Sequence, residues 1–405
     1  MPMHKWETLM DVIRRQRDPL GVSLELEQLL GEGGRGALRG FAEDGARAAA
    51  ERLGFGAAML EKADYVAVDS SEAVRRLVER EGGMVLRLSE ALRELPVVRE
   101  KAWSLIDPRS DRYAAAVALA ELEGVAEGYV VYVPHGVKIR TPIYACMLVT
   151  KKRQRQLLHN IIVLEEDAEA TIVTGCAAAP AAVEALHVGV TEAWLGKGSR
   201  LNYAMVHSWS PGSHVRPRTA VHASRGAAYV SYYVLHGVIG SLHTEPGITL
   251  EEGARAHAAS IIALDGGMAH AGTRVEIHGR NASAEIVSRI VARGTSSIDA
   301  PLRIVAHAAG RGHVECMAVP LSPDARISSS PILETTTDEA ELSHEAAIGK
   351  LRGEEIEYLM ARGLDEATAR RLLLRGLLRV ELPLPPAVKA LVSAVERLLA
   401  EKAVA

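Results

Sequence analysis

The feature of this sequence that most restricts its fold is a short turn signature that recurs at a nearly regular step. The step is roughly 27–31 residues early in the series, with a half step near its end. Short apolar or alternating runs of the kind that form strands lie between the turns. Such a series is typical of a solenoid or parallel β-helix, with a large β-sandwich as the rival interpretation. The signatures are Asp167-Ala168-Glu169, Gly198-Ser199-Arg200, Gly226-Ala227, Gly253-Ala254-Arg255, Asn281-Ala282-Ser283, Asp324-Ala325-Arg326 and Glu339-Ala340-Glu341.

The repeat occupies only the middle of the chain, so three regions are expected. Residues 1–127 have a helical pattern, with apolar residues three or four positions apart in Asp44–Leu53 and Ser71–Glu81. Residues 128–348 contain the strands, and residues 349–405 return to a helical pattern. The C-terminal region is predicted to form three helices, at Glu354–Arg362, Asp365–Leu378 and Pro386–Ala400.

Composition excludes several classes of function. A net charge of −4 and only 4% aromatic residues argue against a protein that binds nucleic acid through positive charge or base stacking. No run of about 18 apolar residues is present, so no membrane-spanning helix is predicted. Met1–Arg14 lacks the apolar run of a signal peptide, and three cysteines cannot build a disulfide framework. A cytoplasmic protein in a reducing compartment is therefore expected.

Several common site motifs are absent or lack their context. Gly31–Gly36 matches G-x-G-x-x-G, but the segment before it is helix-like, whereas a dinucleotide site needs a strand there. The sequence has no phosphate-binding G-x-x-x-x-G-K-[ST], no H-E-x-x-H and no C-x-x-C. A closed structural zinc site is therefore not indicated.

Histidine and cysteine remain as the candidate chemistry. There are 15 His and 3 Cys, and 14 of the His lie between His135 and His344. The step from Cys316 to His344 equals one period, which predicts that the two stack on adjacent coils with Glu345 nearby. The set could hold iron or zinc, or form an activated Cys–His pair for sulfur transfer or nucleophilic chemistry. A register slip of one residue would reverse the faces.

Longer segments, between about Ala114 and Leu378, resemble the SufB/SufD family of scaffold subunits of the SUF iron–sulfur cluster assembly machinery. Gly175–Pro180, a Gly-Cys block, and Asn202–Trp209 are similar to the SufB branch, and the segment around His344 is the most specific part of the match. The segments that carry the resemblance are Tyr132–Val137, Gly175–Pro180 with Leu186-His187, Asn202–Trp209 with Pro211-Gly212, Ala271–Gly279, Ala284–Gly294, Leu342–Ala346, Tyr358–Leu364, and Glu366-Ala367 with Ala369.

The resemblance implies a right-handed parallel β-helix core flanked by N-terminal and C-terminal α-helical domains. It implies a scaffold rather than an enzyme, on which a transient iron–sulfur cluster is built from iron and delivered sulfur. Cys316, His344 and Glu345 correspond to cluster ligands and Cys176 to the sulfur acceptor, while Trp209 is expected to line the sulfur route. The implied partners are a SufC-type ATPase that docks on the C-terminal helices, a sulfur donor protein, and either a second copy or a SufD-like subunit.

The branch within the family rests on the cysteines. Retention of both Cys176 and Cys316 favours a SufB-like role, although the N-terminal cysteine cluster of many SufB proteins is absent and Ser343 and His207 replace a common Glu and Gln. The alternative is a SufD-like accessory subunit that pairs with a SufB without carrying the cluster. A third class, a β-helix enzyme acting on polysaccharide, would need clustered carboxylates instead of Cys and His. Flavin binding and the cluster type are left open.

Overall fold

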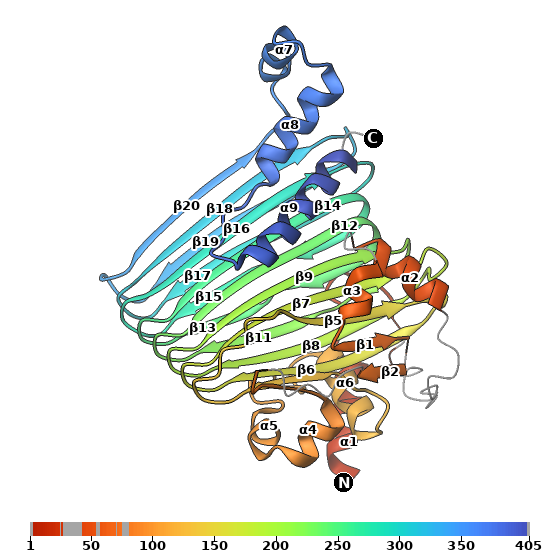
Figure 1. The fold of residues 1–405 in the computed structure, drawn as a ribbon, viewed down its shortest axis with the longest axis vertical. Helices are drawn as coiled ribbons and strands as arrows, with labels where there is room; N and C mark the ends of the chain where they lie inside the picture. The colour runs from red at the N-terminus through yellow and green to blue at the C-terminus, as the bar shows by residue number, and fades with distance from the viewer. Residues whose placement is uncertain are drawn as a thin grey trace.

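The predicted parallel β-helix is confirmed by the structure. The computed structural model describes residues 3–24, 26, 43–53, 57–69, 71–74 and 81–402, so the Gly31–Gly36 motif lies outside the described residues. The chain winds into a β-solenoid of about eight turns, with helices at its N-terminal and C-terminal ends (Figure 1). No helix in these ranges is long and apolar enough to cross a membrane.

The solenoid has two strand-bearing faces, which we call face A and face B. Strands on adjacent coils are parallel. Residues opposite each other in them are between 27 positions apart (His214 and Ser241) and 31 positions apart (Thr171 and Asn202), which confirms the predicted step. Face A contains β5 (Ile143–Val149), β7 (Glu169–Ala178), β9 (Arg200–Trp209), β12 (Ala228–Thr244), β14 (Arg255–Ala271), β16 (Ala282–Ala292), β18 (Gly310–Pro320) and β20 (Glu341–Ile348). Face B contains β4 (Tyr129–Val133), β6 (Arg155–Leu164), β8 (Leu186–Leu195), β10 (His214–Val215), β11 (Arg218–Ala223), β13 (Gly247–Leu250), β15 (Thr273–Ile277), β17 (Ser297–Ala306) and β19 (Arg326–Thr335).

The turn signature has a specific backbone conformation. One residue in each of five successive corners has a positive φ, between 57° and 68°, a region that Gly, Asn and Asp adopt more easily than other residues. The N–H of each corner residue donates to a carbonyl one coil further on, as Gly198 does to Arg225 at 3.0 Å. The repeated signature is therefore the sequence needed to turn the chain at the same place in every coil. The corner residues are Asp167, Gly198, Gly226, Gly253 and Asn281.

Helices cover the outer sides of the solenoid. On face A the cover consists of α2 (Glu43–Glu51) and α9 (Pro386–Lys402), whose apolar residues join the main core. On face B, α1 (Met3–Arg15) and α6 (Arg112–Leu122) pack against β8, and α4 (Leu88–Glu94) packs against β4 and β6. Two shorter helices are α3 (Ala57–Lys62) and α5 (Pro96–Lys101).

The region before residue 128 also contributes strands. β1 (Tyr65–Val68) pairs in parallel with β5, while β3 (Met84–Arg87) pairs antiparallel with β4. The helix predicted over Ser71–Glu81 is wrong at its start, because β2 (Ser71–Val74) is a strand antiparallel to β1. The exposed backbone edge of β1 offers hydrogen bonds that outweigh the local helical preference of this segment.

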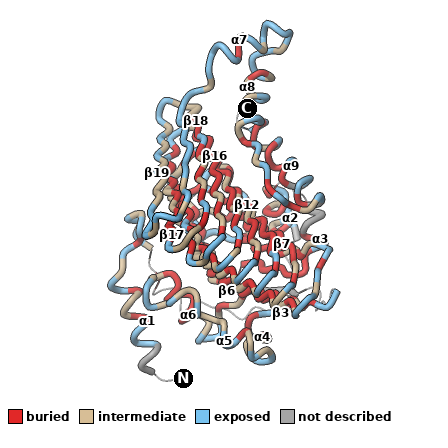
Figure 2. The backbone as a smooth tube through the Cα atoms, turned by 90° about the vertical axis from the view of Figure 1, so that its left-hand side faces the viewer, coloured by how far each residue is buried: buried red, intermediate tan, exposed pale blue. Residues whose placement is uncertain are grey.

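The three C-terminal helices are confirmed, with bounds within two residues of those predicted. α7 (Gly353–Ala361) and α8 (Glu366–Leu378) extend beyond β20, away from the body of the solenoid (Figure 1). Asp365 caps α8 by accepting a hydrogen bond from the Thr368 N–H. The exposed backbone of α7 contrasts with the buried interior of the coils in Figure 2.

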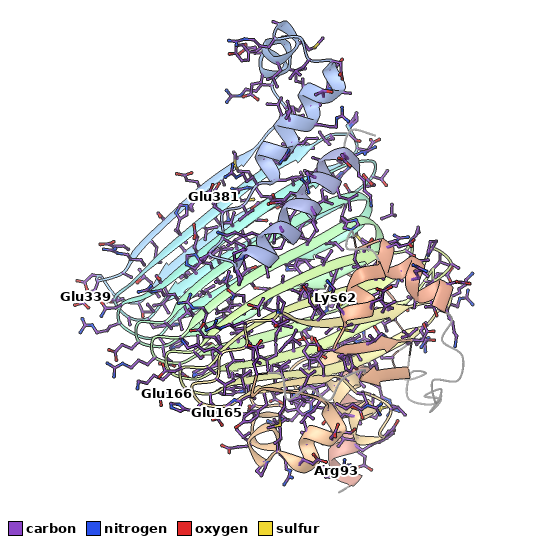
Figure 3. All side chains as sticks on the ribbon, viewed as in Figure 1. Lys62, Arg93, Glu165, Glu166, Glu339 and Glu381 are labelled. Carbon is purple, nitrogen blue, oxygen red and sulfur yellow. The ribbon has the colours of Figure 1, made fainter. Side chains whose placement is uncertain are left out.

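Charged side chains mark the rim where the coils turn. Glu166 pairs with Lys197 at 2.5 Å, one coil away, and Glu339 at the last turn pairs with Arg280. Figure 3 shows Glu165, Glu166 and Glu339 along this rim, where Glu165 accepts hydrogen bonds from the Tyr132 hydroxyl and the His135 N–H. Exposed pairs of this kind contribute little stability individually, so the coils are held mainly by their backbone ladders and apolar interior.

Candidate functional site

Cys316 lies inside the solenoid near its C-terminal end. It is in the middle of β18, with Ser288 of β16 opposite on one side and Ala346 of β20 on the other, and it is 1% exposed. Burial raises the pKa of the Cys316 thiol, and the hydroxyls of Ser329 and Ser288 partly offset that effect. Because Ser329 belongs to β19 on face B, the thiol points into the space between the two faces.

The predicted stacking of Cys316 on His344 is wrong in register. The last step of the solenoid is 30 residues rather than 28, as the His313–Ser343 hydrogen bond of 2.8 Å shows, so His344 lies opposite Val314. The step grows by one residue between β18 and β19 and by one more between β19 and β20. His344 is therefore displaced by two residues, about 6.6 Å along the strand, but it remains on the same side of the sheet as Cys316.

Glu345 lies on the other side of β20. It is opposite Glu315, whose carboxylate is paired with Arg289 at 2.7 Å. Alternate residues of a strand face opposite ways, so Glu345 points away from Cys316 and His344 in this chain. Among the described residues, no set of three His, Cys, Asp or Glu ligands within 4.8 Å of one another includes any of these three.

The end of the solenoid beside Cys316 is open. β20 and β19 each pair with a preceding strand only, among the strands described, and seven of the eight residues of β20 are exposed. His344 is one of these, and Ile348 is 49% exposed. An unpaired strand edge with exposed inward-facing side chains is a surface that can pair with another strand.

Cys176 lies inside the solenoid at a distance of several coils from Cys316. It is in β7, opposite Met147 of β5 and His207 of β9, and it is fully enclosed. Burial raises the pKa of the Cys176 thiol well above its usual value, with a further contribution from Cys146. The thiol is therefore protonated at neutral pH in the absence of a base.

His207, the residue opposite Cys176, belongs to a buried group of rings with His187 and Trp209. The rings of His187 and His207 lie 4.8 and 5.8 Å from that of Trp209, and burial lowers the pKa of both imidazoles, that of His187 to about 3. His187 Nδ1 is bonded to Gln156 Oε1 at 2.8 Å. Among the described residues, Nε2 of His207 and Nε1 of Trp209 have no hydrogen-bond partner, which is uncommon for buried polar atoms.

A continuous series of polar side chains leads from Cys176 to Cys316. Cys176 lies opposite His207, whose Nδ1 is 3.1 Å from the Tyr233 hydroxyl. Tyr233 lies opposite Ser260, whose Oγ is 3.1 Å from that of Ser288, and Ser288 lies opposite Cys316. We call this series the polar line, and its members are Cys176, His207, Tyr233, Ser260, Ser288 and Cys316.

A cavity accompanies the middle of the polar line. Its volume is about 60 Å³, enough for several water molecules, and Tyr233 and Ser260 contribute to its wall together with Tyr203 and Met205. The interior is therefore not closed by packing at this point.

The sequence signal for the middle of the polar line was the period itself. Successive steps back from Cys316 reach Ser288, Ser260 and Tyr233, which are all small or polar residues at equivalent positions. Because neither the serines nor the tyrosine belongs to a recognisable sequence motif, the sequence did not predict them as site residues. Trp209, which was predicted to line a route, is buried beside the polar line rather than in it.

Comparisons with known proteins agree with one another. Residues 147–377 match the family model described as SUF system FeS cluster assembly, SufBD core domain. An iron–sulfur cluster assembly SufBD family protein of Methanothermobacter thermautotrophicus is 37% identical over 317 residues, covering 76% of each chain. Another from Archaeoglobus fulgidus is 35% identical and covers 76% of this chain and 83% of its own. The iron–sulfur cluster assembly protein SufB of Bacillus subtilis is 28% identical, covering 77% of this chain and 68% of its own.

Proposed function

This chain belongs to the SufBD family of iron–sulfur cluster assembly proteins, and we propose that it is a SufB-like scaffold on which a nascent cluster is built. The observation that carries this proposal is the polar line, which joins two buried cysteines through the interior of the solenoid. Cys176 lies opposite the buried His207, and Cys316 lies beside the open end.

Cys176 is the proposed sulfur acceptor. A persulfide on a donor protein passes its terminal sulfur to the Cys176 thiolate: the donor S–S bond breaks, a new S–S bond forms at Cys176, and the donor leaves as a thiolate. The proton of the Cys176 thiol goes to the departing donor thiolate, so the step is balanced without a charged imidazole; His207, which lies opposite Cys176, is kept neutral by burial, which lowers its pKa. The side-chain hydroxyls of Tyr233, Ser260 and Ser288 continue the polar line to Cys316, and they can donate hydrogen bonds to an anionic persulfide group that lies along it.

Cys316 and His344 are the proposed ligands of the nascent cluster. Thiolate and imidazole are both ligands for iron, and mixed ligation of this kind makes a site from which the product can be released. Among the described residues, no third ligand lies with Cys316 and His344, whereas the open end leaves His344 accessible. We therefore propose that a second subunit, either another copy or a SufD-like chain, pairs with β20 and β19 and completes the ligand set.

The C-terminal helices are the proposed docking surface for a SufC-type ATPase. α7 and α8 extend away from the solenoid and expose large apolar side chains, with Tyr358 59% and Met360 44% exposed. α9 is different, because Val392, Val395 and Leu399 are buried against face A. Of the described C-terminal residues, those of α7 and of the outer side of α8 are therefore the ones proposed to receive the partner.

Anaerobic reconstitution with ferrous iron and sulfide tests the scaffold role. The full chain should develop a visible chromophore that Cys316→Ala loses. Cys146→Ala is the matched control, since Cys146 is also a fully buried strand cysteine, but it lies in β5 outside the polar line. A chromophore unchanged in Cys316→Ala would overturn the assignment of Cys316.

The alternative, a SufD-like accessory subunit, makes a different prediction. The isolated protein would form no chromophore under any of these conditions, and it would acquire one only in a complex with a separate cluster-bearing chain. The mass of the purified native complex separates a homodimer from a heterodimer directly.

A further inference from the structure

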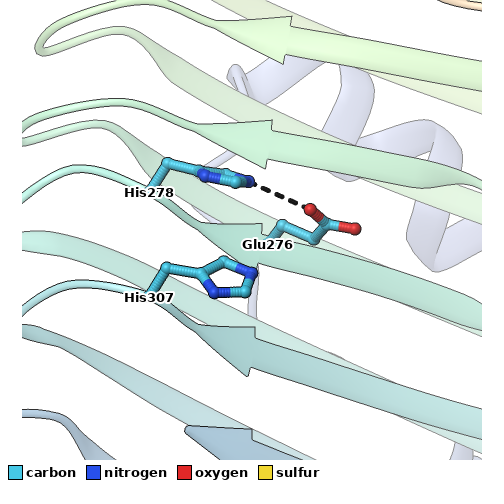
Figure 4. Close-up of side chains that lie close together, drawn as sticks. All are labelled: Glu276, His278 and His307. Atoms are coloured by element: carbon cyan, nitrogen blue, oxygen red, sulfur yellow. Dashed lines mark hydrogen bonds and ion pairs between the residues drawn. The ribbon is translucent and has the colours of Figure 1, made fainter. Parts of the chain in front are cut away.

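A second cluster of ligand-type side chains lies on the outer side of face B, away from the polar line. His278 follows β15 and His307 follows β17, and the pairing of Ile277 with Ala306 brings these two histidines next to each other on adjacent coils. Their ring centroids are 4.7 Å apart and the planes are inclined by 32°. Figure 4 shows the two rings one above the other, with the Glu276 carboxylate beside them.

Glu276 supplies a carboxylate to the same place. It lies two residues before His278 and therefore on the same side of the strand, and its Oε2 is 3.0 Å from His278 Nε2. Its other oxygen, Oε1, is held by Arg274 Nη2 at 2.6 Å. The arginine thus orients the carboxylate and leaves Oε2 directed towards the histidines.

The three side chains can offer one ligand atom each within 4.8 Å of one another, and in the described part of the chain no other set does so. Bound metals need nitrogen and oxygen ligands at about 2.0–2.2 Å, so the three atoms must come somewhat closer together than this limit. His278 and His307 are both exposed and can rotate to do so. Thr336 Oγ1 lies 3.5 Å from His307 Nδ1, which favours Nε2 as the free ligand atom.

We propose that Glu276, His278 and His307 form a binding site for a divalent first-row transition-metal ion. Two imidazoles and one carboxylate suit zinc, cobalt, nickel or ferrous iron better than calcium or magnesium, which prefer oxygen ligands throughout. Three protein ligands leave coordination positions open to water or to a further ligand. The site is on the outer side of face B and Cys316 points into the solenoid, so the inference stands whether or not the scaffold role is correct.

Zinc titration of the full-length, metal-free protein by calorimetry tests the site. Wild type should bind one equivalent of Zn²⁺ that His278→Ala and His307→Ala each lose or weaken by more than about 100-fold, while Cys316→Ala retains it. Arg274→Ala, which removes only the support of the carboxylate, should weaken binding by about 10- to 100-fold. His135→Ala removes an exposed histidine elsewhere and should bind like wild type.

Cobalt provides a spectroscopic check on ligand identity. Co²⁺ at this site should give weak visible bands without the sulfur-to-cobalt charge transfer that a thiolate ligand would produce. Circular dichroism in a chelator establishes that each variant is folded, and Glu276→Gln provides a third variant should either histidine substitution disturb the coil. Zinc binding that is equal in wild type and all three ligand variants, or that disappears in Cys316→Ala, would overturn the proposal.

Discussion

Cys316 and His344 lie on adjacent coils and on the same side of the sheet, but two residues out of register, because Ala346 is the residue opposite Cys316. The thiol is enclosed and the imidazole is exposed at the open end. The two therefore do not form a tight pair within one chain, and a ligand shared between them must lie at the mouth of the solenoid.

His344→Ala should weaken iron binding at this mouth by at least about tenfold, and it should leave sulfur loading of Cys176 unchanged. His313→Ala is the control, because His313 is on the neighbouring strand but on the other side of the sheet, opposite Ser343. Iron content after anaerobic reconstitution and gel filtration measures the effect. If both variants retained wild-type iron, His344 would not be a ligand.

The buried thiols should react slowly. Burial raises the pKa of Cys176 and of Cys316, so at pH 8 the thiolate fraction of each is smaller than for an ordinary cysteine. Alkylation of Cys176 in the native protein should be more than about tenfold slower than in the unfolded chain, since each unit of pKa is a factor of ten, and alkylation of Cys316 should also be slower; both rates should increase as the pH rises above 9. Mass spectrometry of timed alkylation gives both rates, and native rates equal to unfolded ones would contradict the enclosure of these cysteines.

Asp18→Asn should destabilise the protein strongly. Burial alone would raise the pKa of the Asp18 carboxyl, but hydrogen bonds from Arg216 and Tyr113 outweigh burial and lower the pKa to about 2. Both partners of the Asp18–Arg216 pair are fully buried, so the variant leaves an unpaired guanidinium at a cost of about 3–5 kcal/mol in the free energy of unfolding.

Asp11→Asn is the matched control, because the Asp11–Arg15 pair is exposed and its loss should change stability by less than about 1 kcal/mol. The lowered pKa of Asp18 means that its stabilising contribution is complete above pH 4 and disappears as the pH falls towards 2. Urea unfolding of both variants at pH 7 measures the difference, and equal midpoints would show that the buried pair is not stabilising.

His187 should make stability depend on pH in the mildly acidic range. Burial lowers its pKa to about 3, whereas the unfolded chain protonates near 6.5. Above pH 6.5 the protonation of His187 therefore does not reduce the free energy of unfolding. As the pH decreases from 6.5 towards 3 this free energy falls, and at pH 5 the loss due to His187 is about 1–2 kcal/mol. His187→Gln should reduce the slope of unfolding free energy against pH, and His135→Gln, at an exposed position, should not. If the free energy of unfolding changed with pH equally in His187→Gln and wild type, His187 would not be the source of the pH dependence.

Substitutions in α7 should affect partner binding, whereas substitutions in α9 should affect stability. Tyr358→Ala combined with Met360→Ala should abolish binding of a SufC-type ATPase without changing the melting temperature, since both side chains are largely exposed. Leu399→Ala should instead cost about 2–5 kcal/mol of stability, because Leu399 is buried against face A. Pull-down and thermal unfolding separate the two effects, and full ATPase binding by the double variant would place the docking surface elsewhere.

Much of this molecule could be predicted from local sequence. The corner residues Asp167, Gly198 and Asn281 specify the coil length because their backbone must adopt a positive φ, and that constraint is visible in the residue type. The C-terminal helices could also be predicted, from the spacing of their apolar residues. The strand at Ser71–Val74 was not, because its conformation depends on the hydrogen bonds that β1 offers rather than on its own residues.

The sequence by itself determined the repeat, the alternation that directs each side chain inward or outward, and the pair of cysteines. Only the tertiary structure decided which residues meet, because contact between coils depends on the length of every intervening turn. Two extra residues, one in each of the last two turns, place His344 opposite Val314 instead of Cys316. The near-constant steps before them align Tyr233, Ser260, Ser288 and Cys316 in one line. The register between two coils depends on the lengths of all the strands and turns between them, so no local motif could have revealed it.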